Sequence, residues 1–329
     1  MITTYGRGTM ATAGQTRSLR PARSANSGNT SHFASEAVDR ESGAQLVPPS
    51  LLLAALRVKQ WTKNLLLFAG LLFAAKLGEA GRWGDAWLAF TAYAAASSAA
   101  YLLNDVRDVE LDRLHPTKRR RPVASGRLSV RAAIGMSACL CAAALGTASS
   151  LGLVSLLLLV AFLALQIGYS LRLKTIAGLD VLAIAALFAI RAVAGAEAIS
   201  VRISPWLVVC TVLLALLLAL GKRRAELDRV GASARRVLVR YSLPILDRLL
   251  VGTSLATLGT YSAYAVTARD SLEMVATIPF VAGGVGRYFV LIHRHGLGEE
   301  PDDILLKDRP ILLSAAGWIV TAAVLLTLN

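Results

Sequence analysis

Long apolar runs alternate with short polar segments along the chain from about residue 50 onward. A membrane-crossing helix needs about 20 mostly apolar residues, and fewer suffice where neighbouring helices cover it. Several connections between the runs are only a few residues long, which makes successive helices antiparallel neighbours. The pattern predicts an all-α, polytopic membrane protein, a bundle of about nine transmembrane helices. The predicted spans are 64–78 with a lead-in from about residue 50, 84–103, 130–149, 151–170, 178–199, 204–221, 246–267, 273–292 and 310–328.

The overall composition agrees with a membrane protein and narrows the function. Of 329 residues, 55% are hydrophobic and 17% are charged, which lies well outside the usual composition of soluble domains. The formal charge of +14 comes from Lys and Arg between apolar runs, and these do not form the basic face that nucleic-acid binding requires. The three cysteines lie within apolar runs and lack metal-type spacing. We therefore expect no nucleic-acid partner, no disulfide and no zinc site.

The first 48 residues differ from the rest of the chain. They are rich in Ser, Ala, Gly, Thr and Arg, and they lack the apolar core of roughly 7–15 residues that a signal peptide needs. Residues 1–48 are predicted to form a disordered cytoplasmic tail, and residues 49–329 the nine-helix transmembrane domain. The sequence leaves the translation start open between Met1 and Met10.

The distribution of basic residues predicts the orientation in a cell membrane. The loops at 107–131, 172–174, 222–248 and 294–309 hold about twenty Lys and Arg, all on one side of the bundle. The loops on the other side hold only Arg82, Arg202 and Arg269. By the positive-inside rule, the basic side and the N-terminus are expected to be cytoplasmic, and the C-terminus to lie outside.

An acidic motif, N-D-x-x-D-x-x-x-D, follows the predicted helix 84–103 and comprises Asn104, Asp105, Asp108 and Asp112. On a helix the three aspartates fall at i, i+3 and i+7, so their carboxylates share one face. They also lie at the negative end of the helix dipole, a penalty that a bound cation would remove. Oxygen ligands without His or Cys favour Mg²⁺. The motif predicts a Mg²⁺ site with catalytic aspartates; the plainer alternative is a solvated helix end paired with nearby basic residues.

Basic clusters surround this motif on the predicted cytoplasmic side. Lys and Arg both suit phosphate groups, and an acidic metal-type cluster ringed by cations is typical of a polyphosphate–Mg²⁺ pocket. The alternative is that such basic runs only set the topology. Tyr101, one turn before Asp105, is a further candidate for substrate binding, although packing within the bundle explains it equally well. The candidate phosphate-binding residues are Lys59, Lys63, Lys118, Arg119, Lys174, Lys222 and Arg223.

Two further charged features stand apart from these clusters. Arg191 lies inside the predicted span 178–199, and an intramembrane Arg is expected to face the bundle interior. Glu299, Glu300, Asp302 and Asp303 form an acidic loop, which is either solvated or a lid that pairs with nearby basic residues.

The acidic motif, the nine-helix plan and the charged loops resemble the UbiA-type superfamily of intramembrane prenyltransferases, over about residues 50–329. The resemblance implies a helical-bundle enzyme that binds Mg²⁺ and a diphosphate-bearing donor at the cytoplasmic face of the membrane. Superfamily members that prenylate aromatic acceptors carry a second acidic motif, D-x-x-x-D, after the sixth helix. The corresponding segment here, Gly221–Leu227, reads G-K-R-R-A-E-L, which argues against aromatic prenylation.

That segment, with "QWTKNLLLFAGLLFA", "NDVRDVELDRLHPTKRRRP" and "YSLRLK", is similar to the phosphoribosyltransferase branch of the superfamily. The similarity implies 5-phosphoribosyl 1-diphosphate as donor, a polyprenyl (decaprenyl) phosphate lipid as acceptor, and a role in supplying cell-wall arabinan. Two alternatives remain: a prenyltransferase with an aromatic or other acceptor, and a non-catalytic transporter or lipid-binding protein. The sequence leaves open the lipid chain length, the number of Mg²⁺ ions and whether chains associate as a homo-oligomer.

Overall fold

The structure is a computed structural model that describes residues 48–74, 76–231, 236–267 and 272–328. Contacts divide the chain into Met1–Leu46 and Val47–Asn329, and every described helix belongs to the second unit. The tail predicted for residues 1–48 lies outside the described residues, apart from Pro48.

The described residues form α-helices joined by short 3-10 helices. Eight helices in this part of the chain are long and apolar enough to cross a membrane, α10 being counted with the residues just before it. The chain is therefore an all-α, multi-pass membrane protein, as predicted. The long helices are α3 (Ala80–Arg107), α5 (Val130–Ser150), α6 (Leu153–Leu171), α7 (Leu179–Ala198), α8 (Pro205–Val230), α9 (Leu243–Thr267), α10 (Ile278–His295) and α12 (Arg309–Leu328). The short elements are α1 (Pro49–Leu56), η1 (Val58–Phe68), α2 (Ala69–Phe73), α4 (Val109–Leu114), η2 (Lys118–Arg120), η3 (Leu173–Thr175), η5 (Arg236–Arg240), η6 (Leu272–Thr277) and α11 (Pro301–Lys307).

Local sequence explains several helix ends. Ser129 precedes α5, and its hydroxyl oxygen accepts a hydrogen bond from the Ala132 N–H at 3.1 Å, which satisfies a free donor of the first turn. Pro205 opens α8, where its missing N–H costs nothing. Gly296 ends α10 with a φ of 61°, a left-handed conformation that glycine adopts without steric cost.

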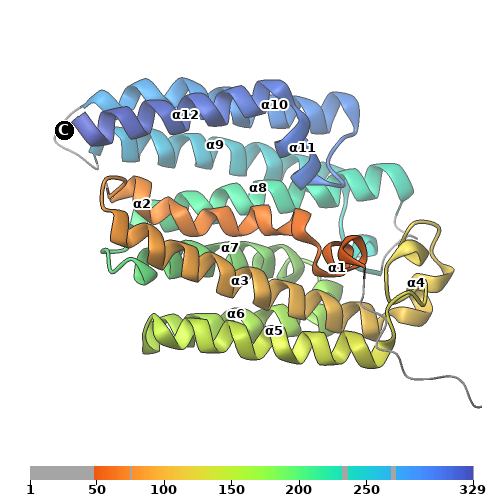
Figure 1. The fold of residues 1–329 in the computed structure, drawn as a ribbon. Coiled ribbons are helices and arrows are strands. Elements are labelled where there is room, and N and C mark those ends of the chain that lie inside the picture. The colour runs from red at the N-terminus through yellow and green to blue at the C-terminus, as the bar shows by residue number, and fades with distance from the viewer. Residues whose placement is uncertain (1–47, 75, 232–235, 268–271, 329) are drawn as a thin grey trace, which may run out of the picture. The chain divides into compact units, whose positions relative to one another are not determined.

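The first predicted span differs from the prediction. Residues 49–73 form α1, η1 and α2 instead of one continuous helix. The apolar window at 64–78 is shorter than the roughly 20 residues that an α-helical span needs. A 3-10 helix rises about 2.0 Å per residue against about 1.5 Å in an α-helix, so the same residues reach farther along the bundle. Figure 1 shows this segment running lengthwise along the bundle, and it contacts both α3 and α7.

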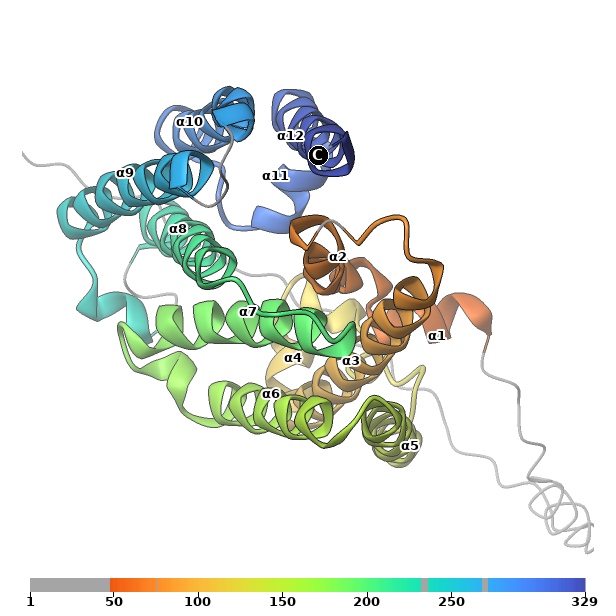
Figure 2. The same cartoon turned by 90° about the vertical axis from the view of Figure 1, so that its left-hand side faces the viewer.

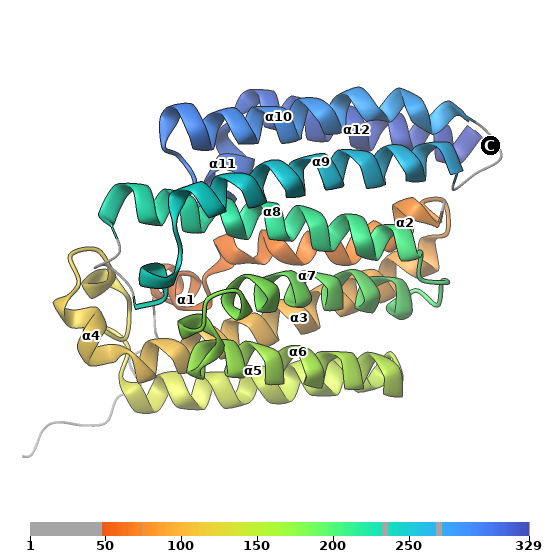
Figure 3. The same ribbon diagram turned by 180° about the vertical axis from the view of Figure 1, so that it is seen from behind.

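The long helices pack around the bundle in chain order. From α3, each helix contacts the next through α5, α6, α7, α8, α9 and α10 to α12. The N-terminal segment completes the arrangement, because η1 contacts α3 and α7 while α2 contacts α7 and α12. Figure 2, which looks along the helices, shows this order, and Figure 3 shows α7, α8 and α9 side by side from behind.

Small residues allow the N-terminal segment to lie directly on α7. A Cβ atom added at Gly195 would come within 2.2 Å of the Leu67 carbonyl oxygen, and one at Gly70 within 3.1 Å of the Ala196 Cα. Close backbone approach at small residues is the usual way in which membrane helices associate. This packing fixes the position of η1, which carries Lys59, Lys63 and Asn64.

The chain segments that follow α3, α6, α8 and α10 gather at one end of the bundle. α1, α4 and α11 lie at this end in Figures 1 and 3, and the C-terminus lies at the other. Contacts between η3 and η5, and between α11 and α8, join these segments. We call this region the charged end. The grouping of the basic loops on one side is as predicted, whereas the cytoplasmic location of that side stays a prediction.

Candidate active site

The acidic motif spans a break between two helices at the charged end. α3 ends at Arg107, Asp108 leaves helical geometry (φ −93°, ψ 12°), and α4 follows. Backbone hydrogen bonds continue across the break: the Asp108 N–H donates to the Asn104 carbonyl at 2.9 Å, and the Asp112 N–H donates to the Asp108 carbonyl at 2.8 Å. The helical spacing behind the prediction is therefore kept, although Asp108 itself departs from helical φ and ψ.

Two of the motif's carboxylates converge on a single cation. Asp105 and Asp112 are only 2% and 3% exposed. Arg121 Nη1 donates to Asp105 Oδ1 at 3.1 Å and to Asp112 Oδ2 at 2.6 Å, and Arg57 also pairs with Asp105. Burial of ionised carboxylates is costly unless they are paired with opposite charges. The Arg57 and Arg121 side chains are 22% and 27% exposed, so solvent reaches these cations while the carboxylates stay covered.

Arg57 has an unusual backbone that places its side chain over the motif. It ends α1 with a φ of 52°, a left-handed conformation that costs a non-glycine residue about 1–2 kcal/mol. Its guanidinium lies 4.9 Å from the centre of the Tyr101 ring and pairs with Asp105. The cation–π and ionic contacts offset the strain. Tyr101 is half-buried and connects Arg57 to the face of α3 that bears Asp105.

The other residues predicted around the motif lie at its rim. The Lys174 ammonium is 3.7 Å from an Asp108 carboxylate oxygen, and Asn104 is half-buried next to Asp105. Lys118 and Arg119 lie on η2 and are exposed. The structure thus brings the aspartates and Lys174 together, whereas Lys118 and Arg119 face solvent.

Asp105 and Asp112 could hold a magnesium ion if the Arg121 side chain moved away from them. The described residues contain no group of three or more His, Cys, Asp or Glu side chains already arranged around a metal position. Mg²⁺ needs only one or two protein carboxylates, because water and substrate phosphates complete its octahedron. Asp105 and Asp112 already share one cation, the Arg121 guanidinium. A Mg²⁺ ion held between them requires Arg121 to move aside.

The end of α8 has the opposite arrangement, with a buried cation among acids. The Arg223 side chain is 1% exposed and the Asp180 side chain fully buried. Arg223 donates to Asp180 at 2.6 Å, to Glu226 at 2.5 Å and to the Tyr169 hydroxyl at 3.4 Å. The Tyr241 hydroxyl donates to the other Asp180 oxygen at 2.6 Å. Burial, reinforced by that hydrogen bond, raises the pKa of Tyr241 to about 12, so it remains a donor at neutral pH.

A third group of charges links η1 to α11. Lys63 lies 2.9 Å from an Asp302 oxygen, and Lys59 pairs with Asp303. Lys307 also pairs with Asp303, at 2.5 Å. Hydrogen bonds from Lys307 and Lys59 hold the pKa of Asp303 below its usual value. The acidic loop thus pairs with nearby basic residues, as one of the two alternatives for it expected, and its partners include two of the predicted phosphate-binding lysines.

Lys222 brings the α8 and α11 groups into one neighbourhood. It is half-buried near the end of α8 and interacts electrostatically with Glu226, Lys63 and Asp302. α11 also contacts α8 directly. Lys63 and Lys222, which are distant in sequence, therefore lie around the same carboxylate.

Several residues of this site were not selected from the sequence. Arg121 belongs to a basic run in which nothing marks one member over its neighbours, and Arg57 reaches the motif only because of its left-handed turn. Asp180 and Tyr241 meet through contacts between distant segments. The one sequence signal for Asp180 is a lone acid at the start of an apolar run.

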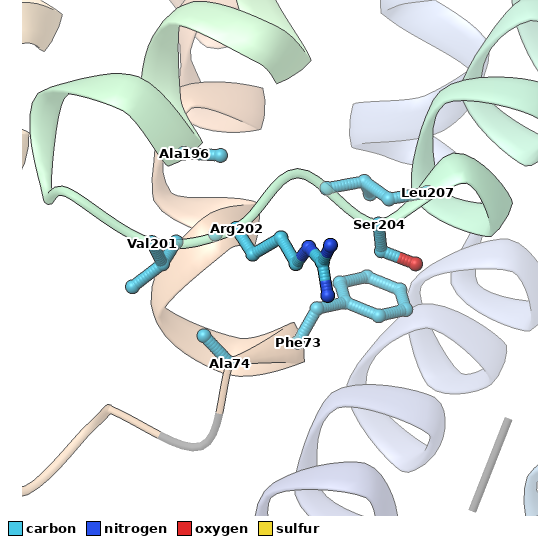
Figure 4. A pocket seen from close by; sticks show the side chains of 8 residues that line it. Phe73, Ala74, Ala196, Val201, Arg202, Ser204 and Leu207 are labelled. Atoms are coloured by element: carbon cyan, nitrogen blue, oxygen red, sulfur yellow. The ribbon is translucent and has the colours of Figure 1, made fainter.

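A small cavity lies away from this site, at the opposite end of the bundle. Figure 4 shows Phe73, Ala196, Arg202 and Leu207 around it, from α2, α7, the following loop and α8. Its volume is about 30 Å³. Such a space holds about one water molecule. It is too small for a diphosphate donor and contains none of the predicted site residues.

Comparison with known proteins gives the same family as the fold and the motif. The UbiA prenyltransferase family model matches residues 64–302. The decaprenyl-phosphate phosphoribosyltransferase of Mycobacterium tuberculosis is 36% identical over 291 residues, which cover 83% of this chain and 95% of the relative. The Mycolicibacterium smegmatis protein of that name is 34% identical, covering 82% of this chain and 90% of the relative. A UbiA homologue from Archaeoglobus fulgidus, solved bound to GPP and Mg²⁺, superposes with a TM-score of 0.67 at 19% identity and covers 85% of this chain and 100% of its own. The chain belongs to the UbiA prenyltransferase family.

Proposed function

We propose that the protein transfers the 5-phosphoribosyl group from 5-phosphoribosyl 1-diphosphate to a polyprenyl phosphate, releasing diphosphate. The observation that carries this proposal is the 36% identity to a decaprenyl-phosphate phosphoribosyltransferase over nearly the whole of that protein. The end of α8 supports the same donor, because Lys222 and Arg223 stand where aromatic prenyltransferases of the superfamily carry acids. The product would supply pentose for cell-wall arabinan.

The chemistry asks mainly for charge stabilisation. The bond between ribosyl C1 and the diphosphate oxygen breaks, and its electron pair leaves with diphosphate. An oxygen of the acceptor phosphate supplies the electron pair of the new C1–O bond. A phosphate monoester is already ionised at neutral pH, so the step needs no strong general base. The negative charge that develops on the leaving group is what the site must stabilise.

The carboxylates of α3 and α4 are the proposed magnesium ligands. Asp105 and Asp112 would hold Mg²⁺ between them, with Asp108 and Asn104 beside it. Mg²⁺ bound there supplies neutralisation of the leaving diphosphate. Arg121 then turns from the carboxylates towards the diphosphate, as the partial exposure of its side chain allows.

The cations have separate roles in this proposal. Lys63 and Lys222 bind donor phosphates once Asp302 withdraws. Lys59, which pairs with Asp303, and Lys174, next to Asp108, are further ligands for the phosphates. The exposed Lys118 and Arg119 attract the anionic donor to the rim. Arg223 is a positioning residue, because all three of its nitrogens already have partners. Tyr101 holds Arg57 over Asp105 and lies within reach of the donor.

The charged end is proposed to face the cytoplasm of the cell that makes the protein. The basic loops favour that orientation by the positive-inside rule. A site at the end of the bundle receives a water-soluble donor from the cytoplasm and a lipid acceptor from the bilayer.

A product assay tests the proposal. The purified protein in lipid nanodiscs would receive radiolabelled 5-phosphoribosyl 1-diphosphate, decaprenyl phosphate and Mg²⁺, and the organic phase would be counted and analysed by mass spectrometry. The expected result is a lipid whose mass has increased by one phosphoribosyl group. A parallel reaction would contain a prenyl diphosphate and an aromatic acid. Turnover in that reaction alone would replace the proposal with aromatic prenylation.

A further inference from the structure

Arg191 is a buried cation inside the bundle. It lies on α7, and it is 4% exposed. Its Nε donates to Asn64 Oδ1 at 2.8 Å, and its Nη1 donates to the Leu187 carbonyl at 3.0 Å. The guanidinium lies 4.5 Å from the centre of the Phe162 ring and 5.5 Å from that of Phe188. The sequence prediction that Arg191 faces the bundle interior is confirmed.

No carboxylate among the described residues forms an ion pair with Arg191. Asp302 is the acid that acts on it through space, and that carboxylate is engaged with Lys63 at 2.9 Å. An unpaired charge within a membrane protein is costly and marks a functional position. Arg223, in the same bundle, is answered by both Asp180 and Glu226. Arg223 therefore has acidic partners, whereas the hydrogen-bond partners of Arg191 are neutral.

Further hydrogen-bonding groups without partners lie around Arg191. Asn64 Nδ2, the Tyr93 hydroxyl and the Ser97 hydroxyl are buried and make no hydrogen bond within the described part of the chain. Asn64 is bonded to Arg191, Tyr93 interacts with it electrostatically, and Ser97 follows Tyr93 by one turn of α3. All three groups carry hydrogens that they can donate. A buried guanidinium beside unused donors fits an anion.

The position of these groups relative to the acidic motif indicates which anion. Tyr93, Ser97, Tyr101 and Asp105 recur every four residues along α3, so each lies about one turn from the next. At 1.5 Å per residue, Tyr93 lies about 18 Å along the helix from Asp105, on the membrane-buried side. Arg191 reaches back along α7 to Leu187 and interacts electrostatically with Tyr101. Its guanidinium therefore lies inward of the motif, between the charged end and the apolar core.

We propose that Arg191, with Asn64 and Tyr93, binds the phosphate of the lipid acceptor; the identification of that lipid rests on the function proposed above. The diphosphate of a water-soluble donor is held at the charged end. The acceptor's apolar tail stays in the bilayer, so its phosphate approaches the ribosyl carbon from the membrane-buried side. The phosphate dianion forms an ion pair with the Arg191 guanidinium. It also accepts hydrogen bonds from Asn64 Nδ2 and the Tyr93 hydroxyl. Arg191 orients the attacking oxygen and transfers no proton.

Three variants test this site. Arg191→Gln removes the charge. Asn64→Asp keeps the oxygen that Arg191 Nε uses but places a carboxylate on the guanidinium, so it preserves the structural contact while neutralising the charge. Arg202→Gln is the matched control, because Arg202 lies at the opposite end of the bundle. Binding of farnesyl phosphate and of uncharged farnesol would be measured in nanodiscs for each protein, together with binding of 5-phosphoribosyl 1-diphosphate.

The wild type and Arg202→Gln are expected to bind farnesyl phosphate about tenfold more tightly than farnesol. Both Arg191→Gln and Asn64→Asp are expected to lose this preference while still binding the donor. A preference that survives in Asn64→Asp, or in folded Arg191→Gln, would overturn the proposal, as would a wild type that does not discriminate. Failure of the wild type to bind the donor would instead overturn the proposed function. The preference for farnesyl phosphate over farnesol could still be measured, because that comparison does not involve the donor.

Discussion

The ends of α3 and α8 both contain buried charged side chains paired with opposite charges, but the buried charges are carboxylates at α3 and a guanidinium at α8. At α3, two buried carboxylates are answered by Arg57 and Arg121, whose side chains remain about one quarter exposed. At α8, the buried guanidinium of Arg223 is answered by Asp180, and both side chains are almost completely covered. The cations of the first pairs are partly exposed to solvent, whereas both partners of the second pair are almost completely covered.

This difference separates a binding site from a structural anchor. In the proposed function a divalent cation replaces Arg121 at Asp105 and Asp112, and the partial exposure of the Arg121 side chain is consistent with that exchange. Breaking the Arg223–Asp180 pair would leave an uncompensated buried charge, which is strongly destabilising. Charged residues at two corresponding helix ends therefore have different expected roles, and substitutions should separate activity from stability.

The largest effect is expected for Asp105→Asn. The amide keeps the size of the side chain but removes one of the two charges that converge on the proposed Mg²⁺ position. We expect kcat/KM for phosphoribosyl transfer to fall by about 10³-fold, with the thermal unfolding temperature nearly unchanged. Glu110→Gln is the control, since Glu110 lies on the neighbouring α4 and its side chain is 78% exposed. Wild-type turnover by Asp105→Asn would remove the α3 carboxylates from the mechanism.

The second largest effect is expected for Asp180→Ala, and it concerns the stability of the protein instead of its activity. The substitution leaves Arg223 without its fully buried partner and should reduce the free energy of unfolding by about 3–5 kcal/mol. Denaturation of the protein in a mild detergent would measure it. Asp228→Ala is the comparison on α8, because the Asp228 side chain is 48% exposed, and it should change stability by less than about 0.5 kcal/mol. Equal stability of the two variants would contradict the anchor role of Arg223.

A smaller effect is expected for Arg121→Gln. In the proposed site Arg121 occupies the space between Asp105 and Asp112 that Mg²⁺ would take, so its removal should lower the Kd for Mg²⁺ measured without donor, by about threefold to tenfold. Calorimetric titration of Mg²⁺ into the donor-free protein would measure this shift separately from the contact of Arg121 with the diphosphate. Arg127→Gln, in the same loop, should leave the titration unchanged. A higher Mg²⁺ requirement would show that Arg121 does not compete with the ion.

The smallest effect is expected for Asp303→Asn at α11. Exposed ion pairs contribute up to about 1 kcal/mol, so release of Lys59 should lower the donor KM by no more than about fivefold. The lowered pKa of Asp303 means that its ion pairs are present at and above the unfolded-state value and are lost only as the pH falls through the lowered one. The ratio of mutant to wild-type KM should therefore be constant between pH 6 and 8. A ratio that varies across this range would mean that another group controls Lys59.

The sequence predicted the parts of the molecule that depend on local pattern. Apolar runs of sufficient length gave eight spans that the structure describes as long helices, and the basic loops between them lie at one end. The same rule failed at residues 64–78, because a 3-10 segment crosses the bundle with fewer residues than a standard helix.

Contacts between distant segments were outside the reach of the sequence pattern. The acidic motif was visible from its spacing, but not the convergence of Asp105 and Asp112 on Arg121. Arg223 was selected as a phosphate ligand because it lies in a basic run; its burial against Asp180 depends on the packing of α7 against α8. A run of basic residues in the sequence shows where positive charge lies, but it does not show which of its side chains are buried.

Selection of a phosphoribosyl donor by the charged end can be measured as donor binding by the purified protein. Calorimetric titration in nanodiscs with Mg²⁺ would compare 5-phosphoribosyl 1-diphosphate with geranyl diphosphate, and EDTA would remove the metal. We expect at least about tenfold tighter binding of the phosphoribosyl donor, and we expect this preference to be lost in EDTA and in Asp105→Asn. Tighter binding of geranyl diphosphate would contradict this expectation.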